Sequence, residues 1–71
     1  MNIIKINTEY IKLDALLKYS GIADTGGYAK ILITEGKVYV NGDICTMRGK
    51  KIFSGDRIRC ENTEVLVEDG N

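Results

Sequence analysis

The hydrophobic pattern of the chain changes its period at Gly36, and this change limits the folds that the sequence can adopt. Before Gly36, apolar residues recur twice at the i, i+3, i+4 spacing of one helix face. They are Leu13, Leu16 and Leu17, followed by Ala29, Leu32 and Ile33. The spacing predicts a helix over residues 13–20 that stops at Gly21. It predicts a second helix that is capped by Asp24 or Thr25 and stops at Gly36.

After Gly36 the apolar residues alternate with polar ones, as they do in strands. Asn41-Gly42 separates two such segments and favours the tight turn of a β-hairpin, because both residues accept positive φ. The predicted strands cover residues 2–7, 37–40, 43–46, 57–60 and 65–67, with a basic loop at 47–51 and turns at 54–56 and 62–63. The predicted order is therefore β-α-α-β-β-β-β. We expect an α+β fold in which two short helices pack on a small, mainly antiparallel sheet.

The length of 71 residues, 44% of them hydrophobic, fits one compact core, and we expect residues 1–71 to form a single domain. The first residues, Met1 to Lys5, lack the apolar core of a signal peptide. No apolar run approaches the roughly 20 residues that span a bilayer. The sequence therefore predicts a cytoplasmic protein with no membrane partner.

The residue types argue against an enzyme. The chain contains no His, and no nucleophile lies beside an evident activating base. Two cysteines, Cys45 and Cys60, are too few for a closed structural metal site, and we expect both to be reduced residues within strands. We expect no metal, no cofactor and no small-molecule substrate.

The charges are distributed unevenly, although the formal net charge is zero. All ten Lys and Arg residues precede Glu61, in a part of the chain that holds six acidic residues. The part from Glu61 onward holds four acidic residues and no basic one. A basic body with an acidic tail predicts an anionic partner for the body, with ordinary solvated surface charge as the alternative.

Four segments, taken in order, resemble the S-four RNA-binding domain, which is named after a ribosomal small-subunit protein. They are KLDALL at 12–17, AKILI at 29–33, GKVYVNG at 36–42 and GDRI at 55–58. The resemblance covers about residues 11–59 and implies the alpha-L RNA-binding motif, in which two helices precede a hairpin. GGYAK at 26–30 and RGKK at 48–51 are similar to the stand-alone bacterial branch of the YaaA/YbcJ type.

Basic residues and glycines near the predicted helix pair are the candidate RNA-binding residues. They are Lys12, Gly26, Gly27, Tyr28, Lys30, Lys37, Arg48, Gly49, Lys50 and Lys51. Lys12 and Gly26 stand where the wider family often has arginine, so we expect Lys30 and residues 48–51 to carry much of the binding. The three basic residues beside Gly49 are unlike the apolar residues that form a hydrophobic core, which makes residues 48–51 the strongest candidates for RNA binding.

Several candidates have a structural interpretation beside the functional one. Gly26 and Gly27 let a phosphate approach helix amides, or form a simple turn. Tyr28 stacks on an unpaired base, or covers the sheet edge. Asn41 is interpreted as a turn former, and the exposed arginines at 57 and 59 as solvated charges.

The expected function is binding of structured RNA, mostly through its backbone. By family analogy the partner is ribosomal RNA or a ribosomal particle. A small protein-interaction adaptor is the main alternative, in which the acidic tail pairs with a basic protein or folds over the basic face. Binding of double-stranded DNA is a third possibility, although the sequence lacks a long recognition helix.

Overall fold

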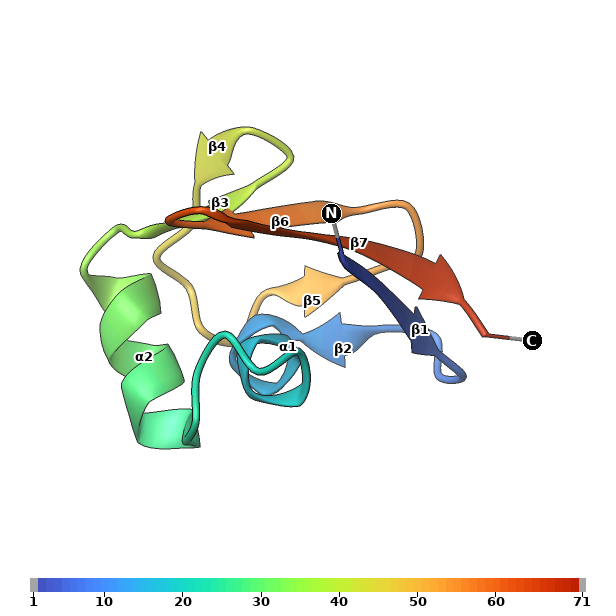
Figure 1. Cartoon of the computed structure of the whole chain (residues 1–71), viewed down its shortest axis with the longest axis horizontal. Helices are drawn as coiled ribbons and strands as arrows, with labels where there is room; N and C mark the ends of the chain where they lie inside the picture. The colour runs from blue at the N-terminus through green and yellow to red at the C-terminus, as the bar shows by residue number, and fades with distance from the viewer. Residues whose placement is uncertain (1, 71) are drawn as a thin grey trace.

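Two layers make up the molecule in the computed structural model, which describes residues 2–70. One layer is a five-stranded sheet with the order β1-β7-β6-β3-β4. The two helices and a two-stranded ribbon of β2 and β5 lie beneath it in Figure 1. The elements are β1 (Asn2–Ile6), β2 (Ile11–Lys12), α1 (Leu13–Tyr19), α2 (Gly26–Thr34), β3 (Val38–Val40), β4 (Asp43–Ile44), β5 (Lys51–Ile52), β6 (Arg57–Cys60) and β7 (Thr63–Asp69). The predicted α+β class, with two short helices on a mainly antiparallel sheet, is confirmed.

Both helices form where the apolar spacing predicts them, and glycines end them. Thr25, rather than Asp24, caps α2, because its Oγ1 accepts a hydrogen bond from the backbone N–H of Tyr28 at 3.0 Å. Gly21 has a φ of 85° and Gly36 a φ of 75°, a left-handed backbone that terminates a helix. The start of α1 differs, since Lys12 occupies its N-cap position and makes no capping hydrogen bond.

The hairpin turn also has the predicted conformation, with φ of 51° at Asn41 and 90° at Gly42. The returning strand β4 is shorter than predicted and ends at Ile44. Cys45 therefore follows the strand, which corrects the prediction that both cysteines lie within strands, while Cys60 lies in β6 as expected. Both thiols are free.

The acidic C-terminal part is not a free tail, because the strand predicted at residues 65–67 is longer in the structure. Thr63–Asp69 forms β7, which pairs antiparallel with β6 on one side and parallel with β1 on the other. The preceding turn is at Glu61-Asn62, one residue earlier than predicted, and Glu61 takes a φ of 55°. An acidic segment that is hydrogen-bonded on both edges is not free to fold over the basic face.

Side chains from one face of the sheet and from both helices form the core. The buried apolar residues are Ile6, Leu13, Leu16, Leu17, Ala23, Ala29, Leu32, Ile33, Val38, Val40, Ile52, Ile58, Cys60, Val65 and Val67. Alternation along β6 buries Ile58 and Cys60 and turns Arg57 and Arg59 outward. The core thus fixes which side of the sheet, the ribbon and the helices can meet a partner.

Strands β2 and β5 are absent from the predicted order. They pair antiparallel, with Ile11 opposite Ile52 and Lys12 opposite Lys51. Ile52 is fully buried, and because neighbouring residues of a strand point to opposite faces, Lys51 points outward. Lys51 therefore belongs to a strand, whereas the sequence predicted it to lie in the basic loop. This short ribbon positions the candidate interface.

Candidate nucleic-acid interface

The ribbon fixes the basic segment, defined as residues 48–51, against the first turn of α1. The backbone N–H of Leu13 donates to the carbonyl oxygen of Lys50 at 2.9 Å. The N–H of Asp14 donates to the carbonyl oxygen of Arg48 at 3.1 Å. These bonds occupy amides that a helix start leaves without intrahelical acceptors. Residues far apart in the sequence are thereby held side by side.

Four basic residues are thereby brought near one another along the backbone, and they are here called the cationic surface: Lys12, Arg48, Lys50 and Lys51. All four residues are exposed. The ion pairs found within residues 2–70 join Lys37 to Glu35 and Arg57 to Glu64, so neither involves this surface. The carboxylate of Asp14 accepts a hydrogen bond from the N–H of Ala15 at 2.7 Å. The cationic surface is therefore available to an external anion.

Gly49 lies at the tip of the basic segment. The N–H of Lys50 donates to the carbonyl oxygen of Met47 at 3.1 Å and closes the turn that contains it. A Cβ added at Gly49 would meet no atom within 4 Å. The turn is therefore open to solvent, and a ligand can approach its backbone closely.

The candidates on α2 occupy its exposed side. Gly26, Gly27 and Tyr28 form the first turn, and Lys30 follows one turn after Gly26. No positive φ requires glycine at either position, and a Cβ at Gly26 would enter open space. The helices α1 and α2 pack together, but no hydrogen bond of the described residues joins α2 to the basic segment.

Lys37 stands apart from the other candidates. It follows α2 at the end opposite to Gly26, and the helix itself extends about 12 Å from Gly26 to Thr34. Its Nζ lies 3.8 Å from Oε1 of Glu35. It directly precedes Val38, which pairs with Cys60 in the sheet. The structure does not bring Lys37 into the cationic surface.

Two aromatic residues that the sequence analysis did not select border the cationic surface. The rings of Tyr10 and Phe53 lie with centroids 5.9 Å apart, and Nζ of Lys51 lies 4.8 Å from the Tyr10 centroid. The signal in the sequence was their spacing, since Tyr10 precedes Lys12 by two and Phe53 follows Lys51 by two. In a paired ribbon that spacing puts all four side chains on one face.

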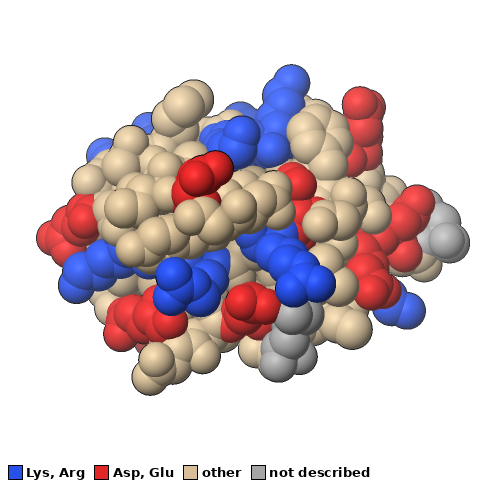
Figure 2. Space-filling model, turned by 90° about the horizontal axis from the view of Figure 1, so that it is seen from above, with Lys and Arg blue, Asp and Glu red and all other residues tan. Residues whose placement is uncertain are grey.

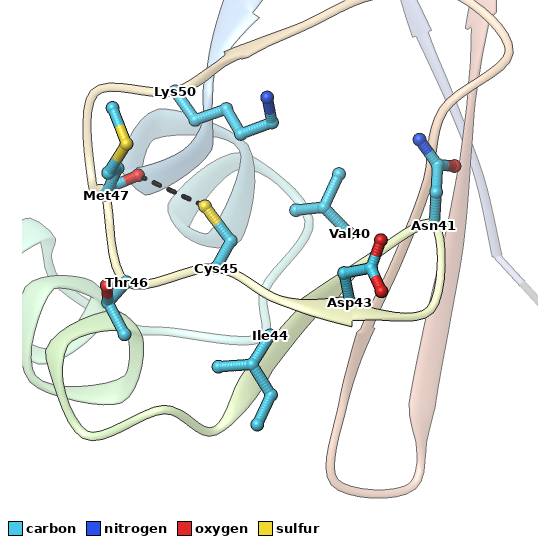
Figure 3. Close-up of a pocket in the computed structure, with 8 residues that line it drawn as sticks. All are labelled: Val40, Asn41, Asp43, Ile44, Cys45, Thr46, Met47 and Lys50. Carbon is cyan, nitrogen blue, oxygen red and sulfur yellow. Dashed lines mark hydrogen bonds between the residues drawn. The ribbon is translucent and has the colours of Figure 1, made fainter.

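A pocket of about 430 Å³ opens on the other side of the basic segment. Its lining residues are Val40, Asn41, Asp43, Ile44, Cys45, Thr46, Met47 and Lys50. Figure 3 shows Lys50 reaching over the pocket from the basic segment, while the thiol of Cys45 donates to the carbonyl oxygen of Met47 at 3.7 Å. Lys50 thus borders both the pocket and the cationic surface.

The outer face of the sheet has a different electrostatic character. Figure 2 shows this side of the molecule, with Lys and Arg side chains interspersed among Asp and Glu. Arg57 lies 3.8 Å from Glu64, and the guanidinium of Arg59 lies 4.4 Å from the centroid of the Tyr39 ring. These internal contacts favour the interpretation of both arginines as surface charges.

The described residues offer no other evident chemistry. No group of three or more Asp, Glu or Cys side chains within residues 2–70 is arranged to hold a metal ion. Neither described helix is long and apolar enough to cross a membrane.

Comparison with known proteins agrees with the resemblance seen in the sequence. The family model of the S4 domain matches residues 4–68, which is nearly the whole chain. The chain belongs to the S4 domain family. Membership supports RNA binding as the general role of this S4 domain and indicates a non-catalytic function.

Two bacterial relatives of this S4 domain align over most of both chains. The "Probable ribosome maturation protein RlbA" of Bacillus subtilis is 38% identical over 60 residues, covering 84% of each chain. The "Putative RNA-binding protein YbcJ" of Escherichia coli is 39% identical over 58 residues, covering 82% of this chain and 83% of the relative. The predicted branch of the family is therefore confirmed.

Proposed function

We propose that this S4 domain binds structured ribosomal RNA, within ribosomal particles or their precursors, through the cationic surface and the exposed side of α2. The observation that carries the proposal is the pair of hydrogen bonds from the start of α1 to residues Arg48 and Lys50. They hold the backbone of the basic segment against the start of α1, so that the four basic residues lie near one another. The Bacillus subtilis relative, named for ribosome maturation, supports a ribosomal target, and such a target corresponds to the cytoplasmic location expected from the sequence.

Rigid positioning matters because ordering flexible charged side chains upon binding costs conformational entropy, which a pre-positioned charge avoids. Lys12 and Lys51 lie on the paired ribbon, and Arg48 and Lys50 lie in the turn that the hydrogen bond from Lys50 to Met47 closes. Lys30 extends the surface along α2, and Gly26 and Gly27 leave the first turn of that helix open to a phosphate. Binding through phosphates reads the shape of folded RNA rather than its sequence.

Neutralising two of these charges tests the proposal. The Lys50→Gln, Lys51→Gln variant should lose co-sedimentation with ribosomal particles, and its affinity for ribosomal RNA should depend less on salt. The slope of log K against log salt should become shallower by roughly 1.4–1.8, since each lost phosphate contact contributes about 0.7 on a single strand and about 0.9 on a duplex. The matched control is Lys5→Gln with Lys18→Gln, which removes the same charge from exposed positions on β1 and α1.

Equal losses of binding in the two double variants would show that net charge, not this surface, drives binding. The adaptor alternative predicts a different result, because a protein partner would remain bound after RNase digestion. Exposed apolar side chains at Ile44 and Met47 are the surface such a partner would use. Equal affinity for double-stranded DNA of the same length would contradict recognition of RNA.

A further inference from the structure

The outer face of the β2–β5 ribbon carries a pair of lysines followed by a pair of aromatic rings. Lys12 lies directly opposite Lys51 in the register. Tyr10 and Phe53 come next on the same face, with ring centroids 5.9 Å apart and planes inclined at 51°. Ile52, between Lys51 and Phe53 in the sequence, is fully buried beneath the ribbon. The buried side of the ribbon thus fixes the direction in which these four side chains point.

Phe53 presents its ring to solvent, since 42% of the residue is exposed. Tyr10 supports Phe53 from one side and is itself covered by the ammonium group of Lys51 at 4.8 Å. Asp56 Oδ2 accepts a hydrogen bond from the N–H of Phe53 at 2.8 Å, which holds the backbone beneath the ring. Phe53 is therefore an exposed aromatic residue packed against Tyr10, whose ring also contacts the ammonium group of Lys51.

The lysine pair is unfavourable for the isolated fold on two counts. Like charges directly opposite each other on paired strands repel. Lys12 is also the N-cap residue of α1, where the helix dipole disfavours a positive charge. No ion pair within the described chain compensates either lysine. A bound anion would remove both penalties.

We propose that this face is a subsite for one unpaired nucleotide of the RNA, with its base stacked on Phe53 and its phosphate between Lys12 and Lys51. The inference rests on the proposed function and narrows its substrate class. A base within an uninterrupted duplex has both faces covered by its neighbours, so only a bulged or looped base can stack on a side chain. The preferred ligand is folded RNA that carries an unpaired nucleotide next to a helical stem.

Two blunt-ended RNA duplexes, each annealed from two strands and therefore without a loop, test the subsite; one carries a single bulged 2-aminopurine and the other is fully paired. The wild-type protein should bind the bulged duplex more tightly than the fully paired one and quench the 2-aminopurine fluorescence through stacking. Phe53→Leu keeps an apolar side chain but removes the ring. It should weaken binding of the bulged duplex by about tenfold and abolish the quenching, while changing affinity for the paired duplex by less than about twofold.

Tyr19→Leu is the matched control, because Tyr19 is 66% exposed on α1 outside the ribbon and should change neither value. The quenching readout uses wild-type protein and so does not depend on any variant folding. Binding of both duplexes with equal affinity and without quenching would overturn the subsite while leaving RNA binding intact. Failure to bind either duplex or ribosomal RNA at low salt would contradict the proposed function as well.

Discussion

Asn41 joins the hairpin turn to the start of β6 through both ends of its side-chain amide. Its Oδ1 accepts a hydrogen bond from the N–H of Arg57 at 2.9 Å, and its Nδ2 donates to Oδ1 of Asp56 at 3.1 Å. Together with the positive φ at this position, these contacts confirm its interpretation as a turn former. Its side chain is therefore committed to the fold rather than to a ligand.

Cys60 is a second residue whose burial has a measurable consequence. Burial raises the pKa of its thiol above the ordinary value of 9.0, and the charge of Glu61 adds to the rise, while Lys37 opposes it. Because the folded-state pKa is the higher one, its contribution to the free energy of unfolding is complete below about pH 9. That contribution should be lost as the pH rises through the folded-state pKa.

Alkylation rates test this assignment. Iodoacetamide should modify the half-buried Cys45 well before the buried Cys60 in the native protein, and a Cys60→Val variant should resist unfolding at alkaline pH better than the wild type does. Equal labelling rates for the two thiols in native buffer would show that the β6 thiol is not sequestered.

At the scale of elements, the long segments with a periodic apolar pattern were predictable from the sequence. The short strands β2 and β5, which form through tertiary contacts, were not. Both helices, the hairpin turn and strands β1, β3, β6 and β7 follow from apolar spacing and turn residues. The ribbon does not, because two residues per strand carry no periodicity and pairing depends on the packing of Ile52. The contact between α1 and the basic segment, which creates the cationic surface, follows from that same pairing. The separation of Lys37 from the basic segment was missed because the sequence shows that Lys37 follows the second helix but not how that end of the helix is placed relative to residues 48–51.

Because Lys12 is the N-cap residue of α1, reversing its charge should raise the stability of the fold and weaken RNA binding at the same time. Lys12→Glu should raise the free energy of unfolding by about 0.5–1 kcal/mol, because it places a negative charge at the positive end of the helix dipole and opposite Lys51. The same change should weaken RNA binding. Urea denaturation and filter binding measure the two effects.

Lys18→Glu is the control for this prediction, since it makes the same charge change in the last turn of α1. It should lower the free energy of unfolding by about 0.5 kcal/mol and leave RNA affinity nearly unchanged. A destabilised Lys12→Glu protein would show that the lysine pair is not repulsive and would remove one support for an anionic ligand there.

At the scale of the whole molecule, the acidic C-terminal part is a structural strand that lies between two others. β7 contributes Val65 and Val67, both fully buried, and pairs with β1 and β6. Burial of one such side chain stabilises a protein by about 1.5–3 kcal/mol, whereas a domain this small has roughly 3–5 kcal/mol in total. The strand that carries the acidic residues is therefore needed for the stability of the fold.

Removal of residues 61–71 should consequently unfold the protein rather than activate it. Circular dichroism and thermal denaturation of the shortened chain should show no cooperative transition. A shortened chain that stays folded and binds RNA more tightly would instead support the sequence-based hypothesis of an acidic tail that covers the basic face.

The central claim, that the start of α1 and the basic segment form one RNA-binding surface, is tested most directly by NMR. Backbone amide shifts of 15N-labelled protein would be followed during titration with the bulged RNA duplex. The account predicts the largest changes at residues 12–14 and 48–53, with small changes at the outer face of the sheet. Largest changes at Arg57, Arg59 and Glu64, with residues 48–51 unaffected, would contradict it.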